Sequence, residues 1–150
     1  MNEELLATLK TVFASHPEVV LAYLFGSHVS GNPGPLSDID IAIVFDEVVP
    51  RDAYFKREIG LMGEVSSAIG KDRIDVVNIA TCDSPLLKQQ AILLGIPIVV
   101  RNNLLKMHYQ QAILREYEDT KYLRTVQYRM MQNHLKHDTF GNITALSVQH

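Results

Sequence analysis

Residues 21–45 have the sequence LAYLFGSHVSGNPGPLSDIDIAIVF, and the rest of the chain can be placed around them. The two apolar ends of this stretch are typical of buried strands, and between them lies a segment rich in glycine and proline. The pattern predicts a strand that ends at Gly26 and Ser27, a loop, and a second strand over residues 39–45. The loop, with its glycines and prolines, returns the chain so that the Gly-Ser turn can face the start of the second strand.

Three aspartates stand in or beside apolar strands, where aspartate is rare. Asp38 and Asp40 are two residues apart, so they are expected on one face of the second strand. Taken alone, Asp38 could be an ordinary strand-entry residue, and Asp75 could form an ion pair with Arg73. Asp40 lies between two isoleucines in a run of buried character. Because an uncompensated buried charge is costly, the three aspartates together favour a metal site.

The chemistry of such a site follows from its ligands. Carboxylates without histidine or cysteine neighbours select Mg²⁺, with Mn²⁺ as the alternative, and two such ions can hold the attacking and leaving oxygens of a displacement at phosphorus. Asp38 and Asp40 would bridge the two ions, and Asp75 would complete the site of the ion nearer the acceptor hydroxyl. Gly26 would let the backbone approach the phosphates, whose β and γ oxygens the Ser27 hydroxyl and nearby N–H groups would hold.

Other apolar patterns predict the remaining elements. Helices are expected at residues 2–15, 52–69, 85–94 and 103–135, the last of them either continuous or bent, and further strands at 73–79 and 96–100. The second helix has a regular apolar stripe made of Phe55, Ile59, Met62, Val65 and Ile69. Pro97 predicts an edge position for the last strand. A lone histidine in a loop is most often solvated, which is the expected state of His28.

Length and composition limit the class of protein. A chain of 150 residues with a formal net charge of −3 predicts one domain without the basic surface that direct nucleic-acid binding requires. Cys82 is the single cysteine, which favours a reducing compartment. The acidic start MNEE is unlike a signal peptide, and no apolar run approaches the roughly 20 residues of a membrane span. We therefore expect a cytoplasmic protein that does not enter membranes.

The expected architecture is a small protein of the α/β (α+β) class. A mixed, partly antiparallel sheet of about four strands would carry helices on one face and a long C-terminal helix. Residues 1–135 would form a single domain, with a core over 5–101 and a helical region over 103–135, and residues 136–150 a flexible tail. The second half of the helical region carries tyrosines and methionines in a charged setting, which favours packing against a partner. These residues are Tyr122, Tyr128, Met130 and Met131.

The central motif resembles that of a known superfamily. Gly26 and Ser27 are followed by ten residues and then by Asp38 and Asp40, which matches the Gly-Ser-x10-Asp-x-Asp signature of DNA polymerase β-like nucleotidyltransferases. Asp75 supplies the third aspartate of that pattern. The short chain is similar to minimal nucleotidyltransferases, the MntA-type antitoxins that pair with HEPN-family toxins. The likeness extends over residues 5–101.

The resemblance implies a polymerase β-like fold and a specific activity. Such a protein would use ATP and two Mg²⁺ ions to transfer AMP to a tyrosine hydroxyl of a HEPN toxin, and so silence that toxin as its antitoxin. It would bind the toxin through the C-terminal helical region and the active-site face. The implied metal ligands are Asp38, Asp40 and Asp75, and the implied nucleotide-binding residues are Gly26 and Ser27. The alternatives are AMP transfer to a small molecule such as an antibiotic, and neutralisation of the toxin by binding alone.

Overall fold

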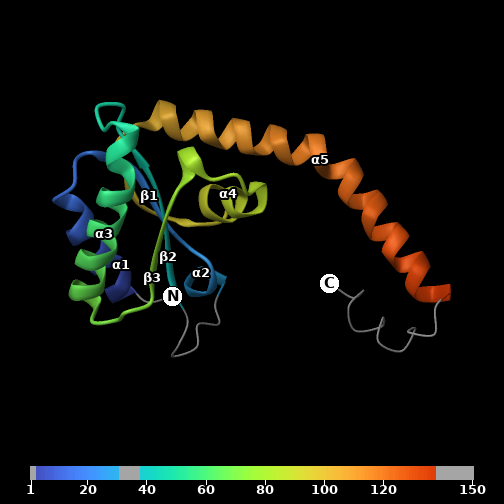
Figure 1. Cartoon of the computed structure of the whole chain (residues 1–150), viewed down its shortest axis with the longest axis horizontal. Coiled ribbons are helices and arrows are strands. Elements are labelled where there is room, and N and C mark those ends of the chain that lie inside the picture. The colour runs from blue at the N-terminus through green and yellow to red at the C-terminus, as the bar shows by residue number, and fades with distance from the viewer. Residues whose placement is uncertain (1–2, 31–37, 138–150) are drawn as a thin grey trace. The chain divides into compact units, whose positions relative to one another are not determined.

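The computed structural model describes residues 3–30 and 38–137, and beyond Glu118 it describes the side chains of Tyr128, Arg129 and Met131 (Figure 1). In chain order the elements are α1 (Glu3–Ala14), β1 (Val19–Phe25), α2 (Ser27–Ser30), β2 (Ile39–Phe45), α3 (Tyr54–Ile69), β3 (Ile74–Asn78), α4 (Pro85–Ile92), β4 (Ile96–Val100) and α5 (Asn103–His137). Short 3₁₀ turns, Arg51–Ala53 and Ile79–Thr81, precede α3 and follow β3. By its internal packing the chain divides into a unit of residues 1–113, which holds the sheet, and a unit of residues 114–150.

The four strands form one mixed sheet in the order β3-β2-β1-β4. Strand β1 is antiparallel to β2 and to β4, whereas β2 and β3 are parallel. The predicted fold class and mixed sheet are therefore confirmed. Strand β4 lies at an edge, as Pro97 predicts. The central strand β1 is buried along its whole length.

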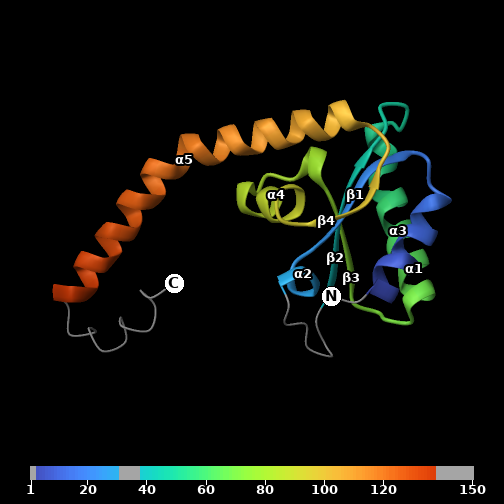
Figure 2. The same cartoon turned by 180° about the vertical axis from the view of Figure 1, so that it is seen from behind.

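Helices cover both faces of the sheet, and the prediction of helices on one face is wrong. Figures 1 and 2 show α1 and α3 on one side of the strands and α4 on the other. The physical reason is that β1 and β2 carry apolar side chains on both faces, and each apolar face must be covered. Helices α1 and α3 join one core cluster through Leu9, Phe13, Leu61 and Val65. Helix α4 and the start of α5 join the other through Ala91, Ile92 and Ile113.

The buried face of α3 differs from the predicted stripe. Phe55 is 75% exposed and Ile59 is 51% exposed, although both belong to that stripe. Leu61, which the stripe leaves out, is buried together with Val65, four residues further on. These two positions define the side of the helix that meets the sheet, and this side is turned away from Phe55 and Ile59. The start of α3 therefore presents two large apolar side chains to solvent.

The ends of α3 and α4 follow the predicted capping pattern with one correction. Gly70 ends α3 in the left-handed conformation, with φ of 78°. The Ser84 side chain accepts a hydrogen bond from the Leu87 N–H at 3.2 Å, and a proline follows it, as predicted. Helix α4 ends at Ile92 rather than at residue 94. Gly95 serves close packing, because a Cβ there would overlap the Ala91 carbonyl oxygen and lie 3.0 Å from the Leu24 oxygen.

Helix α5 is continuous over its 35 residues, which decides between the one-helix and two-helix predictions. The Asn102 side chain accepts a hydrogen bond from the Leu105 N–H at 3.0 Å and so caps its start. Among the described residues, no helix combines the length and apolarity needed to cross a membrane. The predicted loop before Asp38, residues 31–37, and most of the predicted tail, residues 138–150, lie outside the described residues.

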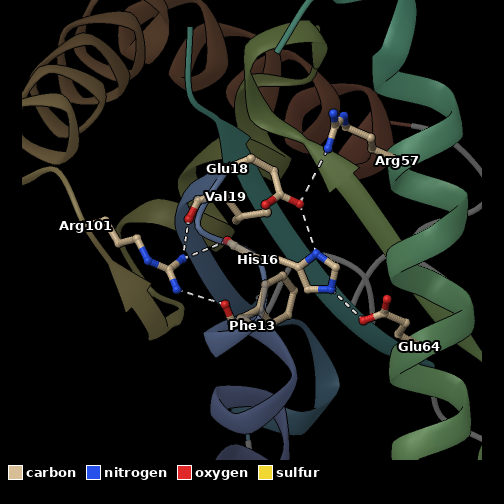
Figure 3. Close-up of polar contacts among 7 residues, drawn as sticks. All are labelled: Phe13, His16, Glu18, Val19, Arg57, Glu64 and Arg101. Carbon is tan, nitrogen blue, oxygen red and sulfur yellow. Dashed lines mark hydrogen bonds and ion pairs between the residues drawn. The ribbon is translucent and has the colours of Figure 1, made fainter. Parts of the chain in front are cut away.

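Arg101, just after β4, fixes the connection between α1 and β1 (Figure 3). Its guanidinium group donates hydrogen bonds to three backbone carbonyl oxygens, those of Phe13 at 2.9 Å, His16 at 3.0 Å and Val19 at 2.6 Å. The first two of these lie at and just beyond the end of α1, where carbonyl groups have no partner within the helix. One side chain therefore joins β4 to the end of α1 and the start of β1.

His16 adds an ionic contact to the same connection (Figure 3). Its Nδ1 lies 2.9 Å from Glu18 Oε1 and its Nε2 lies 2.5 Å from Glu64 Oε2, on α3. Because ionised carboxylates only accept hydrogen bonds, both contacts are made as hydrogen bonds when both ring nitrogens carry a proton, that is, in the cationic form of the ring. Burial by itself lowers the pKa of His16, but the hydrogen bonds and charges of Glu64 and Glu18 outweigh burial and raise that pKa above its ordinary value. Arg57 lies 3.7 Å from Glu18 and completes the cluster.

Candidate active site

The Gly-Ser turn at the end of β1 lies directly against Asp40. Phe25, the last residue of β1, is the register partner of Asp40 in the antiparallel pair with β2. Gly26 follows with φ of 80°, a conformation that favours glycine. A Cβ at Gly26 would overlap Asp40 Oδ2 and lie 3.2 Å from its Cγ. Glycine is therefore required here both for the backbone conformation and for the close approach of the carboxylate.

Asp75 stands beside Asp40 on the neighbouring strand. The two residues are register partners in the parallel pair of β2 and β3, so their side chains leave the sheet on the same face. This face is the one that α4 covers, because Ala42 and Val44, which alternate with the isoleucines of β2, belong to that core cluster. Asp40 is half-buried, whereas Asp38 and Asp75 are exposed. The structure thus brings the three predicted aspartates to one end of β2 and β3.

The electrostatics of Asp40 reflect this grouping. Burial raises the pKa of Asp40, the charge of Asp75 raises it further, and Asp38 adds a smaller effect in the same direction. His28 acts in the opposite sense and lowers that pKa. Three carboxylates that repel one another beside a glycine turn form a site at which a bound cation would remove an unfavourable interaction.

The ion pair that could have explained Asp75 forms at Asp38 instead. Arg73 Nη1 lies 4.0 Å from Asp38 Oδ1, and the two side chains are 62% and 59% exposed. An ion pair at this distance between two exposed groups contributes little to stability. The ion pair of Arg73 with Asp38 gives no structural reason for an aspartate at position 75. An ion pair between Arg73 and Asp75 is therefore a weaker explanation of Asp75 than the sequence alone suggests.

The donor set fits Mg²⁺ or Mn²⁺ bound together with a nucleotide. Within the described ranges, no three His, Cys, Asp or Glu side chains are close enough, as they stand, to enclose one ion. Mg²⁺ does not need such a cage, because it commonly binds one or two carboxylates and completes its shell with water and phosphate oxygens. Asp38, Asp40 and Asp75 offer carboxylate oxygens, which is the donor type that these ions prefer.

A comparison with family models supports this chemistry. Residues 7–104 match the model described as polymerase beta, nucleotidyltransferase. The chain belongs to this nucleotidyltransferase family. The matched residues include every strand of the sheet, the Gly-Ser turn and all three aspartates, so the superfamily predicted from the motif is confirmed.

Solved structures of toxin–antitoxin complexes share the fold of this nucleotidyltransferase. A chain of a mutant MntA-HpeT complex gives a TM-score of 0.66 at 20% identity and covers 88% of this chain and 99% of that one. A chain of a toxin–antitoxin structure with AMP-PNP gives 0.64 at 22% identity over 85% and 98%. A chain of the tri-AMPylated Shewanella oneidensis HEPN toxin in complex with the MNT antitoxin gives 0.60 at 21% identity over 88% and 99%. No curated protein matches the chain.

His28 is the residue of this nucleotidyltransferase that differs most from its expected state. It is not a solvated loop residue but lies on the single-turn helix α2, half-buried. Its Nε2 atom is sealed from solvent and has no hydrogen-bond partner in the described part of the chain. The ring lines a cavity of about 270 Å³ between α1 and the end of α3. Its place directly after Ser27 was the one available signal in the sequence.

Proposed function

We propose that this nucleotidyltransferase transfers AMP from ATP to a tyrosine hydroxyl of a HEPN-type toxin, with Mg²⁺, and acts as the antitoxin of that toxin in the cytoplasm. The observation that carries the proposal is the placement of Gly26 against Asp40, with Asp75 in register beside it. Because Gly26 has no side chain, the backbone of the turn comes close to the Asp40 carboxylate, so that phosphates held by the turn would also meet the ions that the carboxylates bind.

The roles proposed for the three aspartates and the Gly-Ser turn follow from where these residues lie in the sheet and from how exposed their side chains are. Asp38, Asp40 and Asp75 would hold Mg²⁺, which when bound would offset negative charge on the phosphates. The Gly26 backbone and the Ser27 hydroxyl hold the β- and γ-phosphates. The tyrosine oxygen attacks the α-phosphorus, the bond to the bridging oxygen breaks, and pyrophosphate leaves. Asp75 accepts the tyrosine proton, and its exposed position on the edge strand β3 suits an acceptor that another protein presents.

A protein acceptor is favoured over a small molecule by what surrounds the site. In the described part of the chain, α5 is the single element that follows β4, so the described residues provide no second domain to enclose a small acceptor. A toxin brings its own surface. The structures with a similar fold include a tri-AMPylated HEPN toxin in complex with an MNT antitoxin. This combination supports toxin modification for the present chain.

Helix α5 and the active-site face together are the proposed toxin-binding surface. Three large side chains of the unit 114–150 are exposed: Leu114 by 49%, Tyr128 by 37% and Met131 by 47%. Large apolar side chains on a helix surface are typical of protein interfaces. The predicted contributions of Tyr122 and Met130 concern side chains outside the described set.

The test is to incubate the chain with ATP, Mg²⁺ and the product of the adjacent gene, and to locate AMP by peptide mass spectrometry. We expect AMP on a toxin tyrosine, loss of toxin RNase activity, and loss of both effects with Asp40→Asn. Asp52→Asn is the matched control, because it removes one carboxylate from the exposed 3₁₀ turn before α3.

Two results would point to the alternatives. Neutralisation of the toxin that survives Asp38→Ala and Asp40→Ala would show that binding alone is sufficient. AMP transfer to an antibiotic, without transfer to the toxin, would assign a small-molecule acceptor. Either result would overturn the proposal.

A further inference from the structure

The turn that carries Ser27 is held from the side opposite the carboxylates. Asp40 and Asp75 lie on the α4 face of the sheet, whereas Val29 packs against the core cluster of α1 and α3. His28 faces the same helices, because the cavity that it lines is also lined by residues of α1 and of the end of α3. These residues are Glu4, Leu5, Thr8, Ala68, Ile69 and Lys71. Two successive side chains therefore attach α2 to the helical layer behind the sheet.

The same short segment is in contact with the catalytic face through Gly26. The backbone leaves β1 at Gly26, pressed against Asp40, and turns at once into α2, where the Val29 N–H donates to the Gly26 carbonyl oxygen at 3.0 Å. Helix α2 has four residues, and His28 directly follows Ser27 in it. The place of the His28 side chain is therefore coupled to that of Ser27 and Gly26 through two adjoining peptide units.

His28 is poorly explained as a packing residue alone. A purely apolar side chain would fill this place without leaving a sealed polar atom that has lost its hydrogen bonds to water. His28 Nε2 is such an atom within the described ranges. The empty volume beside the ring also shows that the imidazole does not fill its surroundings. The side chain is nonetheless near enough to Asp40 for the two to interact electrostatically.

We propose that His28 is a positioning residue for nucleotide binding: held between α1 and α3, it fixes the Gly26–Ser27 turn at the separation from Asp40 that a metal-bound triphosphate needs. This inference rests on the proposed function. The turn would hold the β- and γ-phosphates before any bond breaks, and these phosphates leave together as pyrophosphate. Loss of His28 should therefore weaken binding of the triphosphate even when no transfer can occur, and it should also slow the departure of pyrophosphate, so KM rises and kcat falls.

The experiment measures binding of α,β-methylene-ATP with Mg²⁺ to the full chain by calorimetry, because this analogue cannot transfer AMP. For His28→Ala we expect about tenfold weaker binding, as the misplaced turn no longer meets the phosphates. Added imidazole should restore part of the affinity, and His28→Gln, which places an amide nitrogen near the Nε2 position, should stay closer to the wild type. Thr8→Ala is the control, because it disturbs the same cavity from α1 without changing the turn.

The outcomes separate the two proposals. If the wild-type chain does not bind the analogue, the proposed function is wrong and the role of His28 falls with it. If the wild type binds and His28→Ala binds equally well, or if Thr8→Ala weakens binding as much as His28→Ala, the positioning role is wrong and the proposed function stands. If His28→Ala does not fold, His28→Ser, which also removes the ring, is measured in its place, and binding equal to that of the wild type would overturn the positioning role.

Discussion

Asp40 and Asp75 are direct register partners on the parallel strands β2 and β3, and the charge of Asp75 adds to burial in raising the pKa of Asp40. Nothing in the packing of the strands requires this pair. The repulsion between the two carboxylates destabilises the free protein, and a cation bound between them would remove that repulsion. The predictions below follow from this relationship and from the contacts that hold the surrounding elements in place.

Neutralising Asp40 should increase the stability of the protein and at the same time abolish its activity. Burial, Asp75 and Asp38 raise the pKa of Asp40, so the folded state binds its proton more tightly than the unfolded state does and loses stability as pH rises through the pKa. At neutral pH, Asp40→Asn should therefore raise the free energy of unfolding by up to about 1 kcal/mol while abolishing AMP transfer. Chemical denaturation with and without Mg²⁺ measures this, and a clear loss of stability in Asp40→Asn would contradict it.

Gly26→Ala should disrupt the turn. The added Cβ would overlap the Asp40 carboxylate at a backbone angle that L-residues rarely adopt. We expect a loss of about 1–3 kcal/mol in stability and at least a tenfold loss of nucleotide affinity. The control is Gly63→Ala on α3, where a Cβ meets no atom within 4 Å and alanine should stabilise the helix by roughly 0.5–1 kcal/mol. Equal affinities for the two variants would show that the turn does not contact the nucleotide.

The His16 cluster should make stability depend on pH. The pKa of His16 is raised above 6.5, so its stabilising effect is complete below that value and is lost as pH rises through the folded-state pKa. Since Glu64 is 54% exposed, we expect an effect of about 1 kcal/mol or less. The free energy of unfolding should fall over this range in the wild type and in His108→Gln, an exposed control, but less in His16→Gln. Identical pH profiles for the wild type and His16→Gln would refute the role of this contact.

Arg101 should be the side chain whose loss most weakens the connection between α1 and β1. Lysine cannot replace it, because one ammonium group cannot reach three carbonyl oxygens in a fixed fork. Arg101→Lys should lower the free energy of unfolding by about 1–2 kcal/mol, against a negligible change for Arg51→Lys on an exposed turn. If both variants unfold at the same denaturant concentration as the wild type, the three hydrogen bonds do not contribute.

Much of the site follows from local sequence patterns. The face shared by Asp38 and Asp40 depends on the two-residue period of a strand, and the turn at Gly26 depends on the chemistry of glycine. The register that sets Asp75 opposite Asp40 is not local, and the prediction of a shared site came from the number and type of acidic residues rather than from pairing. The apolar stripe of α3 does not predict the exposed state of Phe55, because a helical period alone does not say which side of the helix meets the sheet.

Contacts between distant residues were beyond the reach of local patterns. Arg101 binds the carbonyl oxygen of Phe13, 88 residues earlier, and nothing near either residue predicts that contact. His16 and Glu64 are likewise 48 residues apart. The sequence around His28 predicts an isolated loop residue, because the start of α1 and the end of α3 become adjacent to it through the fold alone.

The most direct test of the central claim compares the label transferred from two forms of ATP. The chain is incubated with Mg²⁺, its partner toxin and ATP labelled at either the α- or the γ-phosphate. If Gly26, Asp38, Asp40 and Asp75 form a nucleotidyltransferase site, the α label will appear on a toxin tyrosine, the γ label will not, and Asp40→Asn but not Asp52→Asn will abolish transfer. Transfer of the γ label, or transfer of the α label that Asp40→Asn leaves intact, would contradict the claim.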